Sequence, residues 1–172
     1  MENRSLIKLL TDIIIFLTIV GLIAFVYQIY GERIVTFLYG TQQESVFIED
    51  LLINVTYAVT PEERIQGLSG VTSLGELEGK LFFFDEEDYY GIWMKDMLFP
   101  IDIIWINNDF EVVHIESNVT PDTYPATFLP SRPARFVLET NAFFSETYNI
   151  DVGDKLTIPA ADLPADLKNR LR

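Results

Sequence analysis

Short segments in which apolar and polar residues alternate recur along the chain, and they constrain its fold more than any other feature. Phe47, Leu51, Ile53, Val55 and Tyr57 alternate with mostly polar neighbours, which is the period of a strand with one buried face. Further strands are expected over residues 80–84, 91–94, 101–106, 111–117, 136–141 and 155–158. Short strands in this number predict an all-β domain, a single compact sandwich or barrel with one or two short helices.

The connections between these segments carry turn and helix signals. Residues 107–109, Asn-Asn-Asp, predict a hairpin turn between two of the strands. Thr60 can cap a short helix in which Pro61 takes the first position and Glu63 closes a capping box. The prolines of residues 120–133 remove too many backbone donors for a central strand, so a long ordered loop is expected there.

Residues 13–30 carry no charged side chain. At about 1.5 Å per residue, a helix of this length nearly crosses the hydrocarbon core of a bilayer. We therefore predict one transmembrane helix over residues 13–30, with residues 1–12 as a short cytoplasmic N-terminus and residues 31–45 as a juxtamembrane segment and tether. A cleavable signal peptide is the alternative, but no small-x-small cleavage signature follows the run.

The basic residues around this run favour one orientation. Arg4 and Lys8 precede it and only Arg33 lies close behind it, so the N-terminus is expected in the cytoplasm. The prediction is a single-pass signal anchor that presents an extracytoplasmic β domain over residues 46–159. Residues 160–172 have helical composition and are expected to form a peripheral C-terminal tail.

Charge and residue usage exclude several classes of function. The chain has 26 acidic and 12 basic residues, a net charge of −14. Such a field repels nucleic acid and anionic head groups and favours cationic or neutral partners, although acidity can also serve solubility alone. With no Cys and His114 as the single His, a zinc site is excluded, and no metal or cofactor is predicted. The acidic run 85–88 lacks the spacing of a calcium loop and is expected to be a solvated turn.

Residues 91–106 set one ammonium and two carboxylates, Lys95, Asp96 and Asp102, among side chains that demand burial. Buried charge is costly unless it is paired or used. Asp102 lies in a run that is apolar on both faces, so we expect it to be buried and paired with Lys95, the nearest cation. The pair could orient a small polar ligand beside Trp93, or it could be a structural salt bridge that fixes strand register.

Glu139 is the second acid next to an apolar run. If Glu139 and Asp102 shared a cleft they could act as an acid and base pair, as in glycoside hydrolysis. Pairing of Glu139 with an arginine is the competing expectation, and the candidate partners are Arg64, Arg132 and Arg135. Of the two tryptophans, Trp93 is the candidate for ligand contact, whereas Trp105 is expected in the core.

The same residues carry a family resemblance. Trp93-Met94-Lys95-Asp96 with Pro100-Ile101-Asp102 resembles the Trp-Met-Lys-Asn and Pro-Leu-Asp core of the prokaryotic family called domain of unknown function 192. The flanking matches cover roughly residues 46 to 158 and are Gly67-Leu68, Gly79 to Phe84, Val137-Leu138-Glu139 and Gly153-Asp154. The chain departs from the family at Ser69 and Lys80, where Met is usual, at Asp96, where Asn is usual, and at Phe143, where Gly is usual. The resemblance implies an all-β sandwich-like domain and a location for the site, but no reaction, because the family has no established activity.

The sequence therefore predicts a membrane-anchored extracytoplasmic domain that binds a small or polymeric cell-envelope ligand without catalysis. The candidate ligand-binding residues are Trp93, Lys95, Asp96, Asp102 and Glu139. One alternative is a carboxylate-dependent hydrolase of envelope glycans. Another is a protein-interaction module for a second membrane protein, with its surface near the proline-rich loop.

Overall fold

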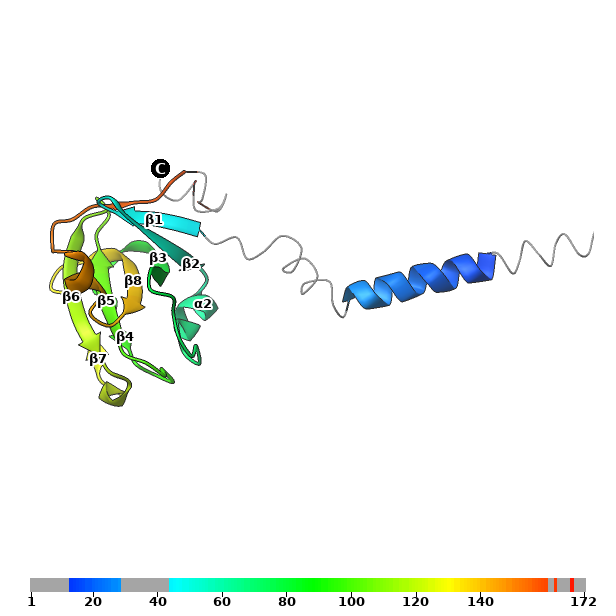
Figure 1. The fold of residues 1–172 in the computed structure, drawn as a ribbon, viewed down its shortest axis with the longest axis horizontal. Helices are drawn as coiled ribbons and strands as arrows, with labels where there is room; N and C mark the ends of the chain where they lie inside the picture. The colour runs from blue at the N-terminus through cyan, green and yellow to red at the C-terminus, as the bar shows by residue number, and fades with distance from the viewer. Residues whose placement is uncertain (1–12, 29–43, 161–162, 164–167, 169–172) are drawn as a thin grey trace, which may run out of the picture. The chain divides into compact units, whose positions relative to one another are not determined.

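The structure, a computed structural model, describes residues 13–28, 44–160, 163 and 168 (Figure 1). The chain divides into two compact units, Met1–Gln42 and Gln43–Arg172, and each is described by itself. The expected segment 1–12, nearly all of the expected tether and most of the expected tail fall outside the described residues.

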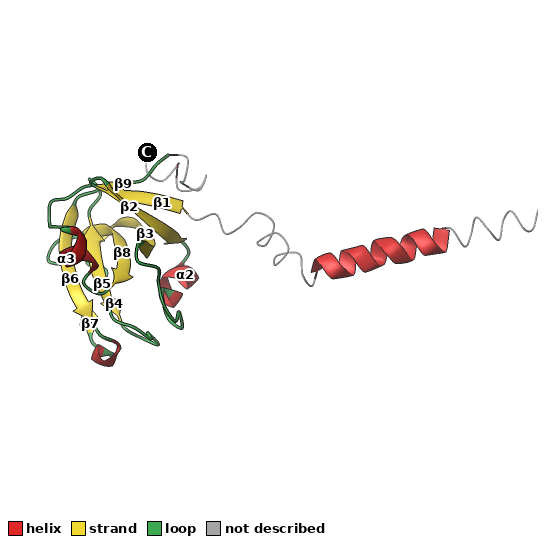
Figure 2. Ribbon diagram, viewed as in Figure 1, coloured by secondary structure: helices red, strands yellow, loops and turns green. Residues whose placement is uncertain are grey.

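The second unit is built on one curled seven-stranded sheet (Figures 1 and 2). Its strand order is β6-β5-β8-β3-β2-β1-β9. The strands are β1 (Glu44–Ile48), β2 (Leu51–Ala58), β3 (Glu78–Asp88), β5 (Ile101–Ile106), β6 (Val112–Val119), β8 (Ala134–Asn141) and β9 (Leu156–Thr157). The β-rich fold is thus confirmed: the seven-stranded sheet curls into a half-barrel, closer to the barrel than to the two stacked sheets of a sandwich.

Strand pairing departs from a simple meander at one point. β2 and β3 are parallel neighbours, and the other pairs of this sheet are antiparallel among the described strands. Parallel neighbours need a crossover connection, which here contains the short helix α2 (Pro61–Gln66). The connection consists of residues 59–77. Residues 64–69 of this connection line a small cavity.

Two hydrophobic clusters cover the two faces of the sheet. Ile104, Phe136 and Leu138 belong to one cluster, on what we call the Phe136 face. Ile103 and Trp105 belong to the other, on the Trp105 face, because successive residues of a strand point to opposite sides. Every residue of β5 is buried, and Trp105 is fully buried, which confirms the core position predicted for it.

The predicted helix start is present in full. The Thr60 side chain accepts a hydrogen bond from the Glu63 backbone N–H, and the Glu63 carboxylate accepts one from the Thr60 N–H at 2.9 Å. Pro61 occupies the first turn of α2, and Gly67 follows the last residue with a positive φ of 49°. The capping box therefore fixes where α2 begins, and Gly67 fixes where it ends.

Several expected elements have different bounds. A single strand was expected through residues 47–57, but the chain turns at Glu49, whose φ is +51°, so β1 and β2 form a hairpin. The acidic residues 85–88 are exposed as expected, yet they form the end of β3 and not a turn. The helix α3 (Phe144–Tyr148) was not predicted.

The proline-rich segment is largely irregular, but it contains two short elements. The 3-10 helix η1 (Pro121–Thr123) is followed by β7 (Thr127–Phe128). β7 pairs with β4 (Ile92–Trp93) in a separate two-stranded sheet. The strand expected over 91–94 is therefore reduced to β4, and it joins the proline-rich segment instead of the main sheet.

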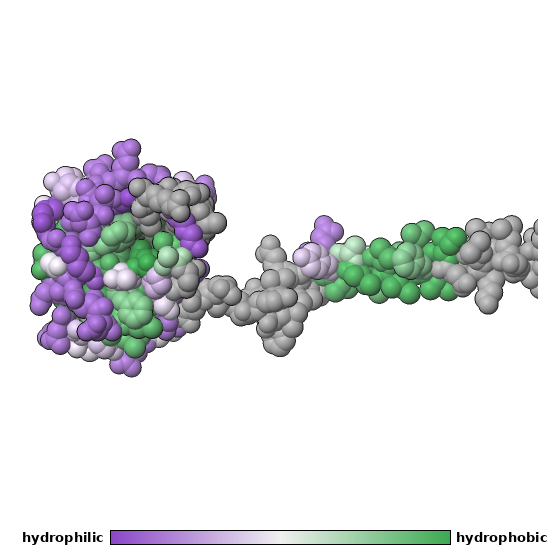
Figure 3. All heavy atoms as spheres, turned by 90° about the horizontal axis from the view of Figure 1, so that it is seen from above, coloured by the Kyte–Doolittle hydropathy of each residue, from purple (hydrophilic) through white to green (hydrophobic). Residues whose placement is uncertain are grey.

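The first unit contributes a helix over residues 13–28, whose visible surface is mostly apolar, with a hydrophilic patch at one end (Figure 3). Its large apolar side chains are exposed. Within the described residues, no helix is both long enough and apolar enough to pass through a membrane. Residues 29 and 30 of the predicted span lie outside the part of the chain that the structure describes.

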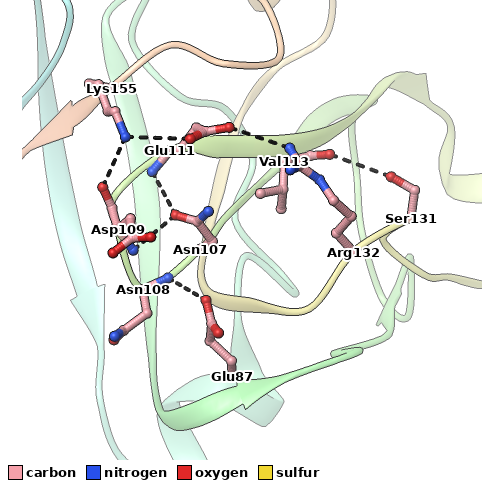
Figure 4. A network of polar contacts seen from close by, with 9 residues as sticks. All are labelled: Glu87, Asn107, Asn108, Asp109, Glu111, Val113, Ser131, Arg132 and Lys155. Atoms are coloured by element: carbon pink, nitrogen blue, oxygen red, sulfur yellow. Dashed lines mark hydrogen bonds and ion pairs between the residues drawn. The ribbon is translucent and has the colours of Figure 1, made fainter.

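The predicted hairpin turn after β5 is confirmed and is held by a polar network (Figure 4). The Asn107 side chain accepts hydrogen bonds from the backbone N–H groups of Asp109, at 3.0 Å, and Glu111, at 2.8 Å. Lys155 reaches the Asp109 carbonyl at 3.3 Å and the Glu111 carboxylate at 3.5 Å. Arg132 approaches the other oxygen of that carboxylate at 3.5 Å, so the turn, the proline-rich segment and the chain before β9 meet here.

Candidate functional site

A small cavity lies on the Trp105 face, between the end of α2 and strand β4. Its volume of about 50 Å³ has room for a few water molecules or one small functional group. Its walls come from α2 and the turn after it, from β3, and from the segment 91–97, while β8 contributes Glu139. We call it the Glu139 cavity, and its lining residues are Arg64, Ile65, Gln66, Gly67, Leu68, Ser69, Phe82, Gly91, Ile92, Trp93, Met97 and Glu139.

Glu139 is a buried acid with an unused oxygen. Its side chain is 5% exposed, and Oε2 is buried without a hydrogen-bond partner. Burial raises the pKa of Glu139 to about 8, although the positive charge of Lys80, its neighbour across the β3–β8 pair, acts to lower it. The carboxyl group therefore holds its proton at neutral pH, because the neutral form has the lower free energy for a buried acid without a partner.

The arginine pairing expected for Glu139 is wrong. The Arg64 guanidinium donates to the carbonyls of Val59 and Phe83, the latter at 2.8 Å. Arg132 approaches Glu111 instead. Arg135 donates to the side chain of Asn108 at 2.6 Å and to the Phe84 carbonyl at 3.3 Å. All three candidate partners are therefore used elsewhere, and Oε2 of Glu139 stays unbonded.

Gly67 brings the backbone directly against this acid. A Cβ atom at Gly67 would lie 3.3 Å from Cζ of Phe82 and 3.8 Å from Oε2 of Glu139. The residue also has a positive φ of 49°, which L side chains rarely adopt. A glycine at this point thus both ends α2 and leaves the space beside the carboxyl group open.

The motif segment 91–97 closes the opposite side of the cavity. Ile92 and Met97 are each 8% exposed and point inward, whereas Trp93 is 47% exposed and meets the ring of Tyr124 edge-on at 6.3 Å. The segment is fastened to the turn after α2, since the Ser69 hydroxyl donates to the Lys95 carbonyl at 2.7 Å. Trp93 is thus both at the mouth of the cavity and available to solvent.

Lys95 and Asp96 lie outside the cavity lining, and both are exposed. Their contribution to the site comes from their backbone: the Asp96 carbonyl accepts a hydrogen bond from the Gly70 N–H at 2.9 Å. Asp96 has a φ of +55°, so it serves as a left-handed residue in the turn. The motif thus positions Trp93 and Met97, while its two charged side chains face away from the cavity.

Asp102 is fully buried and saturated with donors. Oδ1 accepts from the Ser117 hydroxyl at 3.0 Å and from the backbone N–H groups of Asn118 and Phe143, both at 2.8 Å. Oδ2 accepts from the Ser145 backbone at 2.9 Å and from its hydroxyl at 2.5 Å. The buried position was predicted, but the expected partner was not found: the exposed Lys95 makes no ion pair with Asp102 within the described part of the chain.

The register of β5 and β8 separates the two acids. Asp102 pairs with Thr140, and Ile103 pairs with Glu139. Paired residues share a face and successive residues alternate, so Asp102 points to the Phe136 face and Glu139 to the Trp105 face. The shared cleft expected for an acid and base pair is therefore absent, and Glu139 is the single carboxyl among the described residues of the cavity lining.

An open groove continues from the cavity mouth. Its volume is about 300 Å³, and it shares with the cavity Arg64, Ile65, Phe82, Gly91, Ile92 and Trp93. Phe84 and Tyr90 extend its wall, with their rings stacked at 3.5 Å between centroids. Arg64 lies 5.2 Å from the centroid of Phe84. We call this region the outer groove; a ligand could lie along its aromatic wall and place one group beside Glu139.

Sequence reasoning placed Trp93 and Glu139 in the site and missed Arg64, Gly67 and Phe82 as lining residues. A signal for Gly67 was available, because a glycine that follows a capped helix often ends it, and here Gly67 does so at a positive φ. No local pattern connects Gly67 with Glu139, because the two are distant in sequence and meet where the β2–β3 connection packs against β3 and β8.

Comparisons with known proteins agree with this fold. The family model DUF192, described as "Uncharacterized ACR", matches residues 44–158. The chain belongs to the DUF192 family. Among solved structures, a candidate transcription regulator from Sinorhizobium meliloti 1021 is similar with 29% identity and a TM-score of 0.64, over 70% of this chain and 95% of that one.

A second similar structure is a protein of unknown function from Novosphingobium aromaticivorans DSM 12444, with 28% identity and a TM-score of 0.62. That match covers 65% of this chain and 82% of the other. No curated protein gives a significant match. The family and the two similar structures give a fold and no activity that can be assigned to this chain, so the function has to be argued from the cavity.

Proposed function

We propose that the DUF192 domain binds a small polar ligand, or one end of a polymeric cell-envelope ligand, and does no chemistry on it. The ligand lies in the outer groove and places one polar group in the Glu139 cavity. The observation that carries the proposal is Oε2 of Glu139, a buried oxygen with no partner beside an open space. An unsatisfied buried polar atom costs about 1 to 3 kcal/mol, which a ligand group bonded to it would recover.

Binding is favoured over catalysis by what surrounds the acid. The Ser69 hydroxyl, the one hydroxyl in the described lining, donates to a backbone carbonyl and is not poised as a nucleophile. The other candidate acid, Asp102, points to the Phe136 face of the sheet, and its carboxylate already accepts five hydrogen bonds. A glycan hydrolase would need a second carboxyl in the same cavity.

The test is thermal unfolding of the full-length protein with envelope sugars, short peptides and small amines, for the wild type, Glu139→Gln and Trp93→Ala. A ligand at about a hundredfold its Kd stabilises the folded state by about 2.7 kcal/mol. We expect one ligand class to raise the midpoint in the wild type, to lose that effect in Glu139→Gln and to lose about half of it in Trp93→Ala. A ligand that stabilises all three proteins equally would place binding elsewhere.

A protein-interaction function is a second candidate, favoured by one observation. Large apolar side chains are exposed around the two-stranded sheet: Trp93 at 47%, Leu98 at 60%, Tyr124 at 46% and Leu129 at 57%. Exposed apolar patches often mark docking surfaces. Leu129→Asp would disrupt such a surface and leave small-ligand binding intact, so co-purification of a partner with the wild type and not with this variant would support it.

We also propose that residues 13–30 anchor the protein and that the DUF192 domain lies outside the cytoplasm. The support is the absence of charge from this run, the exposed apolar side chains of the helix over 13–28, and the Lys/Arg excess before it. A polymeric or small envelope ligand is the class that a domain in this location would meet.

A further inference from the structure

We propose that the ligand group taken into the Glu139 cavity is a primary ammonium, carried by a free amine or by a lysine side chain. This inference rests on the proposed function, because it names the chemistry of the group that the same cavity receives.

The free oxygen of Glu139 is an acceptor that matches the donors of an ammonium. Glu139 is more than nine-tenths buried, and its Oε2 lies beside the opening left by Gly67. A primary ammonium supplies three N–H donors and no acceptor, and it is small enough for a cavity of about 50 Å³. A hydrogen bond between an ammonium and a carboxylate is roughly twice as strong as a bond between neutral groups.

The walls of the cavity present aromatic rings to an entering group. Phe82 and Trp93 both line the cavity, and Met97 adds a polarizable thioether. An ammonium is attracted to the face of an aromatic ring, and a neutral hydroxyl gains no comparable attraction. Trp93 is half-exposed at the mouth, so one of its faces is available to an entering cation.

Two cations of the chain itself, Lys80 and Arg64, lie near Glu139. Lys80 is the strand neighbour of Glu139, and its charge acts on the pKa of that acid without overcoming the effect of burial. The Arg64 guanidinium is held by two backbone carbonyls and lies against the Phe84 ring. Neither side chain bonds Oε2 of Glu139. The position beside Oε2 of Glu139 is therefore open to a cationic ligand. The net charge of −14 attracts such a ligand to the protein.

Binding of an ammonium requires the ionised form of Glu139, so its proton leaves for the buffer as the ion pair forms. With a pKa of about 8, Glu139 is about nine-tenths protonated at pH 7 and about one-tenth protonated at pH 9. We expect release of about 0.9 proton per ligand at pH 7 and about 0.1 at pH 9. Apparent affinity for an ammonium should rise about tenfold over the same range.

The experiment is isothermal titration calorimetry on the full-length protein, in two buffers of different ionisation enthalpy, at pH 7 and pH 9. The probes are n-butylammonium and 1-butanol, which has a similar shape without the charge. We expect the ammonium to bind, to release a proton at pH 7 and to bind more tightly at pH 9, while 1-butanol binds at least tenfold more weakly. Nα-acetyl-lysinamide represents a lysine side chain and glucosamine represents an amino sugar. The probe that binds more tightly identifies the source of the ammonium.

Glu139→Gln keeps the shape of the protonated acid but cannot ionise, and it should abolish both ammonium binding and its pH dependence. Glu146→Gln makes the same change at an exposed acid of α3 and should behave as the wild type. Equal binding of 1-butanol, or affinity that falls as pH rises, would overturn the ammonium assignment and leave a binding function standing. Absence of binding by every amine and by every ligand of the thermal panel would overturn both.

Discussion

Asp102 and Glu139 come from neighbouring strands one residue out of register, and their side chains point to opposite faces of the same sheet. Asp102 gathers five hydrogen bonds on the Phe136 face. Glu139 leaves one oxygen unbonded on the Trp105 face. The two acids that sequence reasoning joined in one site therefore have separate tasks, which mutations can distinguish.

Replacement of Asp102 by Asn should destabilise the fold strongly. The amide places an N–H₂ group where the carboxylate accepted from the backbone of Asn118 and Phe143 or from Ser145. Loss of several charge-assisted hydrogen bonds in a buried position predicts a decrease of about 3 to 5 kcal/mol in the free energy of unfolding. Urea denaturation of the wild type and the variant measures it.

The matched control is Asp151→Asn, which makes the same change at an exposed aspartate and should shift the free energy of unfolding by less than about 0.5 kcal/mol. Asp102→Asn should also leave ligand affinity at the Glu139 cavity unchanged in the protein that remains folded. A stable Asp102→Asn protein that had lost binding would mean that Asp102 belongs to the site.

The dependence of the free energy of unfolding on pH should reveal the ionisation of the Glu139 carboxyl group. An unfolded glutamate has a pKa near 4.3, whereas burial raises the pKa of Glu139 in the folded state to about 8. Between those values the folded protein keeps a proton that the unfolded chain has lost. The free energy of unfolding therefore falls as pH rises from about 4.5 to about 8, by up to about 1.4 kcal/mol per pH unit.

Other acids titrate in the same range, so the measured quantity is the difference between the wild type and Glu139→Gln at pH 5, 6, 7 and 8. The difference should shift in favour of the variant as pH rises. Glu146→Gln should follow the wild type throughout. Parallel curves for the wild type and Glu139→Gln would show that the buried carboxyl ionises no differently in the two states.

Trp93→Ala should weaken binding while the domain stays folded. Nearly half of this side chain is exposed, so its removal should lower the free energy of unfolding by no more than about 1.5 kcal/mol. Loss of an aromatic face at the mouth predicts an affinity reduced about tenfold. Leu98→Ala is the control, because Leu98 is 60% exposed and is not part of the cavity lining. Equal affinity of the two variants would remove Trp93 from the site.

Thr60→Ala should destabilise the domain by about 1 kcal/mol through loss of the N-cap. The hydroxyl accepts from the Glu63 N–H at 3.2 Å, and α2 positions Gly67 at its end. Thr60→Ser keeps the acceptor and should restore most of the stability. Thermal unfolding of the three proteins measures the effect, and a Ser variant as unstable as the Ala variant would assign the loss to the threonine methyl group instead.

The proposed location predicts a protease result. In intact cells, an external protease should degrade the DUF192 domain, and the protein should stay with the membrane fraction after a high-salt wash. Deletion of residues 13–30 should release the domain from that fraction. Digestion that occurs only after lysis would reverse the orientation, and a wild-type protein in the soluble fraction would remove the anchor.

The parts of the fold that follow from local pattern could be predicted. The apolar run 101–106 predicted a buried interior strand, Asn107 marked the hairpin turn after it, and Thr60 marked the start of α2. The hairpin of β1 and β2 could not be predicted, because its turn uses a left-handed glutamate, Glu49, where glycine or asparagine is the usual signal.

The partners of the site residues depend on contacts that are distant in sequence. The donors to Asp102 come from the end of β6 and from the start of α3, and two of them, Asn118 and Phe143, have positive φ values of 54° and 62°. Phe143 and Asp96 are also positions where the family usually has Gly and Asn, the residues that tolerate this backbone region best. The sequence shows that Phe143 and Asp96 differ from the usual Gly and Asn. It does not show the left-handed backbone that makes Gly and Asn usual at these positions.

The parallel pairing of β2 and β3 also bears on how fast the domain folds and unfolds. These strands can pair only after the chain between Ala58 and Glu78 has closed over the sheet, and such non-local closure is slow. Gly67 belongs to that connection and Glu139 to the strand beyond β3, so an occupant of the cavity touches both sides of the closure. Release of the connection would first require the occupant to leave, so occupancy should slow unfolding more than it speeds folding. A ligand of modest affinity would thus lengthen the lifetime of the folded domain, independently of any signal that its binding conveys.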